Sequence, residues 1–397
     1  MNHLYDFYAN FQIDTEDSSN AKSDIDDLTK KRNKYKKIED TLSRIKLLST
    51  AFGVKSKLPD KNMIPNRINS DVYAKVGEGE NDSGLKTLIH VSKDYNKDIK
   101  KYLDDGLQLI YNSNSNKSVN INILNLPKGS WIIKFKMTLL KSFISNDDTS
   151  FYIIDNPVKK DKVFGIPYTS AMSWKGNLRW TMMKIHLEPL INSPEEFADM
   201  RFLHTLLFGS EKGMEEESAG WANYLDNLCQ SAKKNYQNKL KEEFKQEKIP
   251  NIKGTLFFYP TFWNEIDMDV INPHNRKTKS GKNPIYYEII PEGAIGSFRL
   301  LYIPIHYFAC KLSDDSFFLK ILQDMLNIVV ALKEMMLIYG FSAKKSCGFG
   351  VIKDEFKESL FDINGIDIKE EDKQFKNFSE LEEKVKSVKQ KTFKRRG

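Results

Sequence analysis

The chain has 397 residues, 40% of them hydrophobic and 12% aromatic, which is long and apolar enough for a large core or two domains and excludes a largely disordered protein. Its formal net charge of +7 and pI near 8.9 are mildly basic. A phosphate-rich partner is compatible with this charge, but many soluble basic proteins bind no such partner.

Cysteine, histidine and hydropathy patterns narrow the class of protein further. Three isolated cysteines (Cys229, Cys310 and Cys347) and six histidines without a HxxxH pair argue against a zinc site and for a reduced, intracellular protein. The N-terminus lacks a signal-peptide pattern. The longest apolar stretch, 317–339, is interrupted by charged residues and is too polar for a membrane span. We therefore expect a cytoplasmic protein without a membrane partner.

The first third of the chain differs from the rest in composition. Residues 1–125 are rich in Lys, Asp, Asn and Ser. Apolar residues at helical spacing predict helix over 24–52, whereas 76–84 and 112–118 have the composition of loops. This pattern predicts an N-terminal extension, partly helical, over residues 1–125.

Regular elements become dense after residue 125. Alternating apolar and polar residues from Trp131 predict a strand, and Ser173 is expected to cap a helix whose apolar face carries Leu178, Met182 and Ile185. A second helical region contains the sequence MRFLHTLLFG. Residues 229–249 are strongly charged and indicate an exposed helix, and 254–263 indicate a strand.

The last third adds a basic loop, strands and a long helix. Residues 271–284 form the loop, 285–305 predict two strands around a turn, and 317–339 predict a buried helix that ends at Gly340. A short strand is expected at 351–356. The charged tail, 366–397, is expected to fray. Strands separated by helices in this order predict an α+β, ferredoxin-like (RRM-like) domain over 126–365, with helical insertions.

The most informative stretch is residues 155–179, DNPVKKDKVFGIPYTSAMSWKGNLR. An aspartate opens a basic loop that leads into a helix start carrying Lys175, Gly176 and Arg179. Amide groups at a helix start bind anions, glycine permits close backbone approach, and the two cations add charge-assisted contacts to phosphate. On spacing alone, an ordinary capped helix with exposed basic residues stays an open alternative.

Two further segments have a composition suited to a polyanion. The loop AKKSCGFG places Lys345 and Ser346 before Gly348, Phe349 and Gly350, so that backbone amides can follow a phosphate and the phenyl ring can stack. It lacks the order of a nucleotide P-loop, which excludes a nucleoside triphosphatase of that kind. The loop 271–284 carries Arg276 and Lys277 and has the charge to follow a nucleic-acid backbone. A plain turn and a solvated loop are the corresponding alternatives.

Four aspartates follow the first predicted strand. Beside an RNA backbone, an aspartate can help to bind a divalent cation or align a 2′-hydroxyl for attack on its phosphate. Each of them is equally compatible with a simple turn residue. They are Asp147, Asp148, Asp155 and Asp161.

Taken together, these segments resemble the RAMP (repeat-associated mysterious protein) superfamily of CRISPR proteins, and most closely the RNA-binding backbone subunits of type III effector complexes, of the Csm and Cmr kinds. The first segment is similar to a family pattern of Asp, a small residue, Pro-Val, basic-Asp, Gly-x-Pro, Lys-Gly and Leu-Arg. LLFGSE (206–211) and AKKSCGFGVI (343–352) resemble two further family markers. The likeness covers roughly residues 130–355.

The resemblance implies an RRM-like fold that cradles guide (CRISPR) RNA, contacts target RNA and assembles with other type III effector subunits in antiviral defence. It implies that Lys175, Arg179 and the Gly-rich loop contact RNA. In catalytic members the aspartate before Pro-Val cleaves target RNA with a divalent metal, so Asp155 is the expected catalytic residue, with Mg2+ or another divalent cation as cofactor.

Three functions stay open at this point. The chain is either a guide-holding subunit that also cleaves target RNA through Asp155, or a non-catalytic, single-copy subunit that caps the complex at the guide 3′ end. The sequence departs from the family pattern where YTSAMSW (168–174) replaces Pro-Gly-Ser-Ser, and the long N-terminal region suits the second alternative. A stand-alone endoribonuclease fits less well, because no histidine lies in the RNA-facing motifs.

Overall fold

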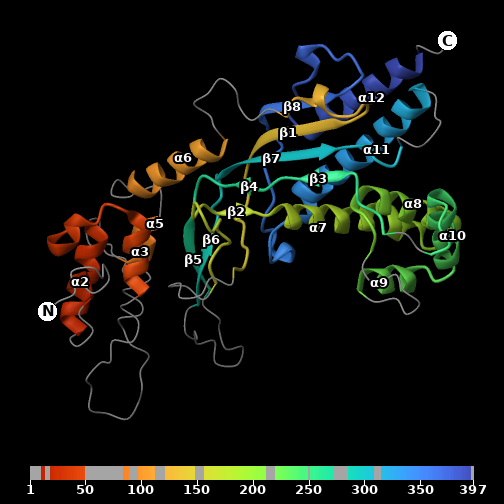
Figure 1. Cartoon of the computed structure of the whole chain (residues 1–397). Helices are drawn as coiled ribbons and strands as arrows, with labels where there is room; N and C mark the ends of the chain where they lie inside the picture. The colour runs from red at the N-terminus through yellow and green to blue at the C-terminus, as the bar shows by residue number, and fades with distance from the viewer. Residues whose placement is uncertain are drawn as a thin grey trace. The chain divides into compact units, whose positions relative to one another are not determined.

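The computed structural model describes part of the chain, which divides into two compact units, each built from three separate stretches (Figure 1). Both units contain helices and antiparallel strands, so the predicted α+β class is confirmed. Unit 1 comprises 1–119, 142–168 and 262–294; unit 2 comprises 120–141, 169–261 and 295–397. The described residues are 10–13, 18–49, 84–89, 97–111, 121–147, 156–211, 220–248, 251–271, 285–307 and 314–394.

The N-terminal part of unit 1 is helical, as predicted, but in several short pieces. Lys31 and Asn33 adopt positive φ angles, which no helix interior tolerates, so the predicted helix over 24–52 is interrupted there. Residues such as Ile25, Leu28 and Leu47 are fully buried in a common core. The elements are α2 (Ser18–Lys30), η1 (Asn33–Lys37), α3 (Thr41–Ser49), α5 (Leu85–Ile89) and α6 (Lys97–Tyr111).

A two-stranded antiparallel sheet completes unit 1. It pairs β5 (Asp267–Ile271) with β6 (Ile285–Ile289). Met268 of β5 joins the same hydrophobic core as the N-terminal helices. Buried Glu288 of β6 accepts a hydrogen bond from the Val158 amide at 3.0 Å and forms an ion pair with Lys160. These contacts tie the segment after residue 155 to the β5–β6 sheet.

Unit 2 is built on a four-stranded antiparallel sheet. Its strands are β3 (Leu256–Phe258), β7 (Ile295–Tyr302), β1 (Trp131–Thr138) and β8 (Lys357–Ile363), in that order. β1 and β7 pair along their whole length, with Trp131 opposite Tyr302 and Phe135 opposite Phe298. The prediction of strands from Trp131 and within 285–305 is therefore confirmed. Alternate residues of β1 are buried, as a half-covered sheet requires.

Three helices pack against one face of this sheet, and α11 and α12 lie side by side (Figure 1). Phe135 of β1 lies 5.7 Å from Phe378 between ring centroids, and Trp174 lies 5.1 Å from Phe298. The helices are α7 (Ala171–Met182), α11 (Asp314–Glu334) and α12 (Phe378–Lys394). The predicted helix 317–339 is confirmed: α11 continues as a π-turn, η7 (Met335–Tyr339), and Gly340 ends it with a φ of 73°.

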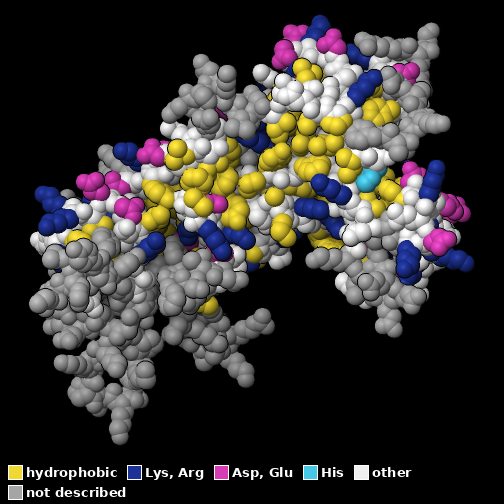
Figure 2. All heavy atoms as spheres, viewed as in Figure 1, with side chains coloured by type: hydrophobic (Ala, Val, Ile, Leu, Met, Phe, Trp, Pro, Cys, Tyr) yellow, Lys and Arg dark blue, Asp and Glu magenta, His cyan; other side chains and the backbone are white. Residues whose placement is uncertain are grey.

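A helical insertion between α7 and β3 forms its own core cluster around residues such as Leu187, Phe197 and Tyr236. The predicted charged helix is α10, where basic and acidic side chains lie next to one another at the α10 end of the unit (Figure 2). Mixed charges of this kind indicate a solvated surface and no single-sign patch. The insertion comprises η5 (Met183–Leu187), η6 (Glu188–Leu190), α8 (Pro194–Phe208), α9 (Gly220–Leu228) and α10 (Ala232–Phe244).

Three predicted elements need correction. Within its described residues, 366–394, the tail is packed and not frayed: α12 buries Phe378, Leu381 and Val385 fully. No strand is formed at 351–356, because β8 begins only at Lys357. The single strand predicted over 254–263 is split into β3 and β4 (Thr261–Phe262), with Pro260, which has no amide hydrogen to donate, between them. The remaining short elements are β2 (Tyr168–Thr169), η4 (Ile123–Asn125), η8 (Lys345–Cys347) and η9 (Glu370–Asp372).

In the described part of the chain, no helix combines the length and the apolar character that crossing a bilayer demands. The predicted loop at 112–118, and the predicted loops at 76–84 and 271–284 except for Gly84 and Ile271, lie outside the described residues.

Candidate nucleic-acid interface

Helix α7 carries the first group of predicted site residues, but it starts earlier than the sequence suggested. The N-cap is Ser170, whose side-chain oxygen accepts a hydrogen bond from the Ser173 amide at 3.1 Å. The predicted cap at Ser173 is therefore wrong. Lys175 and Gly176 lie inside the helix and not at its start, so their backbone amides are engaged in the helix.

The two faces of α7 have different roles. Trp174, Leu178 and Met182 recur every four residues and are fully buried, and the Trp174 indole Nε1 donates to Thr261 Oγ1 at 3.0 Å. Gly176 is exposed, and a methyl group added there would meet nothing within 4 Å. No packing contact within the described chain therefore demands glycine at this position, which leaves room for another molecule to approach the helix backbone closely.

The Gly-rich loop folds back on itself directly after η7. The Phe341 amide donates to the Gly350 carbonyl at 3.0 Å, and a Cβ on Gly350 would lie 2.7 Å from the Ser342 backbone nitrogen. The φ of Gly350 is +72°, so glycine is needed here for the turn itself. Gly348 also has a positive φ but faces open space. Ser346 is exposed, whereas Phe349 is half-buried.

The tertiary structure brings α7 and this loop together. Lys345 Nζ lies 4.6 Å from the centroid of the Trp180 ring, and Asn177 Nδ2 donates to the Phe341 carbonyl at 3.3 Å. Two segments separated by more than 160 residues thus form one surface. Sequence reasoning missed Trp180, the α7 aromatic residue that Lys345 contacts, because nothing in its local pattern distinguishes it from a core tryptophan.

The cations of this surface are partly desolvated. Burial lowers the pKa of Lys175, and the nearby Arg179 charge lowers it further. Burial also lowers the pKa of Arg179, although the Glu211 carboxylate opposes that shift. Burial lowers the pKa of Lys345. In each case the protonated form is less favourable than in water, and a bound phosphate would restore part of the lost stabilisation.

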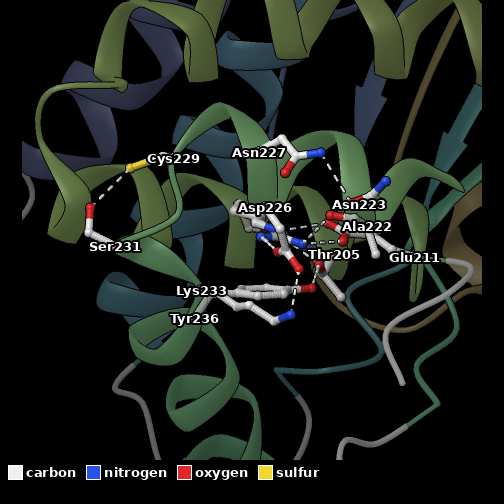
Figure 3. A network of polar contacts seen from close by, with 11 residues as sticks. Thr205, Glu211, Ala222, Asn223, Asp226, Asn227, Cys229, Ser231, Lys233 and Tyr236 are labelled. Atoms are coloured by element: carbon white, nitrogen blue, oxygen red, sulfur yellow. Dashed lines mark hydrogen bonds and ion pairs between the residues drawn. The ribbon is translucent and has the colours of Figure 1, made fainter. Parts of the chain in front are cut away.

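A buried ion network joins α8, α9 and α10 within the helical insertion (Figure 3). Arg201 donates from Nη2 to Glu211 Oε2 at 2.7 Å, from Nε to Glu211 Oε1 at 3.1 Å, and from Nη1 to Asp226 Oδ1 at 2.6 Å. Its guanidinium lies 4.2 Å from the Tyr236 ring centroid. Burial acts to lower the pKa of Arg201, but the hydrogen bonds and charge of Glu211 outweigh it and raise this pKa.

The LLFGSE motif has a structural explanation in this network. Gly209 ends α8 with a φ of +88°, and a Cβ there would lie 2.9 Å from the Ile252 carbonyl oxygen. The sharp exit places Glu211, two residues later, against Arg201 of the same helix. Sequence reasoning noted the motif but missed Arg201 and Asp226, because the partners are far apart in the chain.

The predicted acidic and loop residues are only partly placed. Asp161 accepts hydrogen bonds from the Val163 and Phe164 amides at 2.9 Å, which is the behaviour of a turn residue. Within the described ranges, no group of three or more His, Cys, Asp or Glu side chains is arranged to hold a metal ion. Asp148, Asp155, Arg276 and Lys277 lie outside the described residues.

Comparison with known proteins finds one matching family model and a number of matching solved structures. The model of the RAMP superfamily matches residues 76–353, which is more than half of the chain. A solved structure described as "Cryo-EM structure of the Type III-B Cmr-beta bound to cognate target RNA" is 14% identical, with 85% of this chain and 98% of that chain covered and a TM-score of 0.37. That TM-score is too low to establish a shared fold. No curated protein sequence matches the chain significantly.

Proposed function

Because the chain belongs to the RAMP superfamily, we propose that it is an RNA-binding subunit of a type III CRISPR effector complex, which holds guide RNA and contacts the guide–target duplex. The observation that carries this proposal is the surface shared by α7 and the Gly-rich loop, where Lys175 and Lys345 are partly desolvated and Lys345 lies against Trp180. Such a surface suits a phosphodiester chain. Sequence specificity then comes from base pairing, and the protein contacts backbone and shape.

We further infer a ferredoxin-like (RRM-like) topology for the sheet of unit 2. In chain order its elements are β1, α7, β3, β7, α11 and β8, which is the β-α-β-β-α-β order of that motif. The strand order β3-β7-β1-β8 supports it, since the first and third strands of the motif lie in the middle of the sheet. In this topology the insertion between α7 and β3 is an addition to the domain.

The first experiment compares RNA binding by the full-length chain and by two lysine variants. Lys175→Ala and Lys345→Ala are each expected to weaken binding of single-stranded RNA and to reduce the slope of log affinity against log salt by about 0.7, because each removes one phosphate contact. Fluorescence anisotropy at several salt concentrations measures both quantities. The control is Lys386→Ala in α12, an exposed lysine paired with Glu382.

Gly176→Ala separates binding from stability in the same assay. Alanine is favoured in a helix interior and meets no neighbour here, so the variant is expected to be more stable by about 0.5–1 kcal/mol. It is nonetheless expected to bind RNA more weakly, because a methyl group keeps the RNA backbone from α7. If none of the variants Lys175→Ala, Lys345→Ala and Gly176→Ala changes RNA binding, this surface does not contact RNA.

Target cleavage through Asp155 is a secondary proposal, supported by the position of this aspartate before Pro-Val. In the assembled complex with Mg2+, Asp155→Ala is expected to abolish cutting of target RNA while guide RNA is retained. Asp161→Asn is the matched control, since an asparagine oxygen can still accept the turn hydrogen bonds of Asp161. If the Asp155→Ala complex cuts target RNA as fast as the parent complex, Asp155 is not the catalytic residue.

The second candidate is a non-catalytic subunit that caps the complex at the guide 3′ end. The N-terminal helices, which share a core with Met268 of β5, favour it, because added helices of this kind offer surface for a terminal subunit. Native mass spectrometry of the assembled complex separates the two candidates: a backbone subunit is present in several copies, and a cap in one.

A further inference from the structure

An open aromatic cavity of about 370 Å³ lies beside the C-terminal end of α7, within unit 2. It is lined by Trp180 and Met183 from α7 and η5, and by Gly220, Trp221 and Tyr224 from α9. Its volume is near the lower end of the range of small-ligand sites. None of the cavity residues is among the predicted RNA-contacting residues. One of them, Trp180, contacts the predicted RNA-contacting residue Lys345.

The rings of the cavity are exposed to an extent that is unusual for large aromatic side chains. Trp221 is 38% and Tyr224 41% exposed, and the two rings meet edge to face at 6.0 Å between centroids. Trp180 is held in place by Tyr339, which it contacts edge to face at 5.2 Å. Met183 is almost completely buried and forms the base. The cavity thus has a fixed wall and an exposed, accessible ring.

Cationic side chains surround these rings. Lys345 Nζ lies 4.6 Å and Lys184 Nζ 5.6 Å from the Trp180 ring centroid, and the Arg179 guanidinium carbon lies 6.0 Å from the Trp221 ring centroid. Lys184 is paired with Glu188 one turn away. Arg179 and Lys345 come from the two segments that form the RNA surface. Aromatic rings interleaved with cations are the usual means of holding a single-stranded nucleic acid.

We propose that this cavity binds one unpaired RNA base, stacked on the Trp221 ring, with the adjoining phosphate toward Arg179 and Lys345. The inference rests on the proposed RNA-binding function and assigns a binding site for one base of the bound RNA. Bases splayed out of a helix stack on aromatic side chains and on guanidinium planes; the cavity supplies the aromatic rings, and the Arg179 guanidinium lies near the Trp221 ring. An apolar peptide side chain would use the rings but would gain nothing from the surrounding cations.

Tryptophan fluorescence reports this site directly. Of the five tryptophans, Trp131, Trp174 and Trp263 are 0% exposed, so quenching by a stacked base arises at Trp180 and Trp221. Single-stranded RNA is expected to quench the full-length protein. An RNA backbone of equal length without bases is expected to bind through its phosphates without quenching.

Trp221→Ala is expected to weaken binding of single-stranded RNA by about 5- to 150-fold, the effect of one lost stacking contact. It is also expected to remove most of the quenching and to leave the salt slope unchanged, since no charge is lost. Trp221→Phe, which keeps a stacking ring, is expected to retain most of the affinity. Because Trp221 is partly exposed, both variants should keep the melting temperature of the parent protein.

Each contrary outcome has one meaning. If the parent protein does not bind single-stranded RNA, the proposed function fails together with this inference. If RNA binding depends on Lys175 but not on Trp221, or if the base-free chain quenches equally, the cavity takes no base while the proposed function stands. If Trp221→Ala keeps its RNA affinity but no longer assembles with other effector subunits, the cavity is a protein contact and the inference is overturned.

Discussion

Arg201→Met is expected to lower the free energy of unfolding by about 3–5 kcal/mol, because it leaves two buried carboxylates without their shared cation. Arg201 and Glu211 are 1% and 4% exposed, and Asp226 is 7% exposed. Lys233 still reaches Asp226 at 3.0 Å, but Glu211 loses both of its hydrogen bonds from the guanidinium. The uncompensated charge of Glu211 therefore carries most of the expected loss.

Unfolding of the full-length chain in guanidinium chloride measures this loss of unfolding free energy. Lys386→Met is the matched control: it removes one cation from the exposed pair with Glu382 and is expected to cost about 0.5 kcal/mol or less. Adding Glu211→Leu to Arg201→Met is expected to recover part of the stability, because it removes the orphaned charge. A loss below about 1 kcal/mol for Arg201→Met would show that water or another cation compensates Glu211.

Asp324 is expected to make the stability of unit 2 depend on pH. Burial raises the pKa of this carboxyl to about 6, even though hydrogen bonds from Tyr302 and Tyr307 oppose the shift. Between about pH 4 and pH 6 the folded state keeps a proton that the unfolded state has lost. Stability therefore falls as pH rises through that window and levels off above it, by about 3 kcal/mol in total.

Asp324→Asn tests whether stability falls with rising pH as expected. The asparagine carbonyl oxygen still accepts from both tyrosines but carries no charge, so the variant is expected to be more stable than the parent near pH 8 and equal to it near pH 4. The difference in unfolding free energy between the two proteins, measured across that range, isolates the contribution of this group. Asp367→Asn, which makes the same substitution at an exposed position, is the matched control. A flat curve for Asp324→Asn would contradict the raised pKa.

Several elements could be predicted from the sequence because their signals are local. The period-two alternation in β1 indicates which face of the strand is buried. The apolar run of α11, followed by Gly340, indicates where that helix ends. Leu178 and Met182 were expected on the buried face of α7 for the same reason. The α+β class followed from the order of such elements along the chain.

The candidate site was predictable only in part. The sequence pointed to Lys175, Gly176, Arg179 and the loop from Lys345 to Gly350 as separate segments, each compatible with an ordinary turn or helix. It did not indicate that Lys345 lies against Trp180, nor that α9 supplies Trp221 to the same surface. These contacts join residues more than 40 positions apart, and no local period encodes such a pairing.

By itself, the sequence determined the class of the fold, several strands and helices, and a family resemblance, all of which depend on residue type and short-range spacing. Only the tertiary structure decided that the charged tail contains a packed helix, since scattered apolar residues such as Phe378, Leu381 and Val385 are meaningful only against the sheet and α11. It alone decided which carboxylates meet Arg201, and which cations surround the rings of the cavity. The physical reason is that burial and charge pairing are properties of the assembled core, where the cost of an unpaired group is set by neighbours from distant parts of the chain.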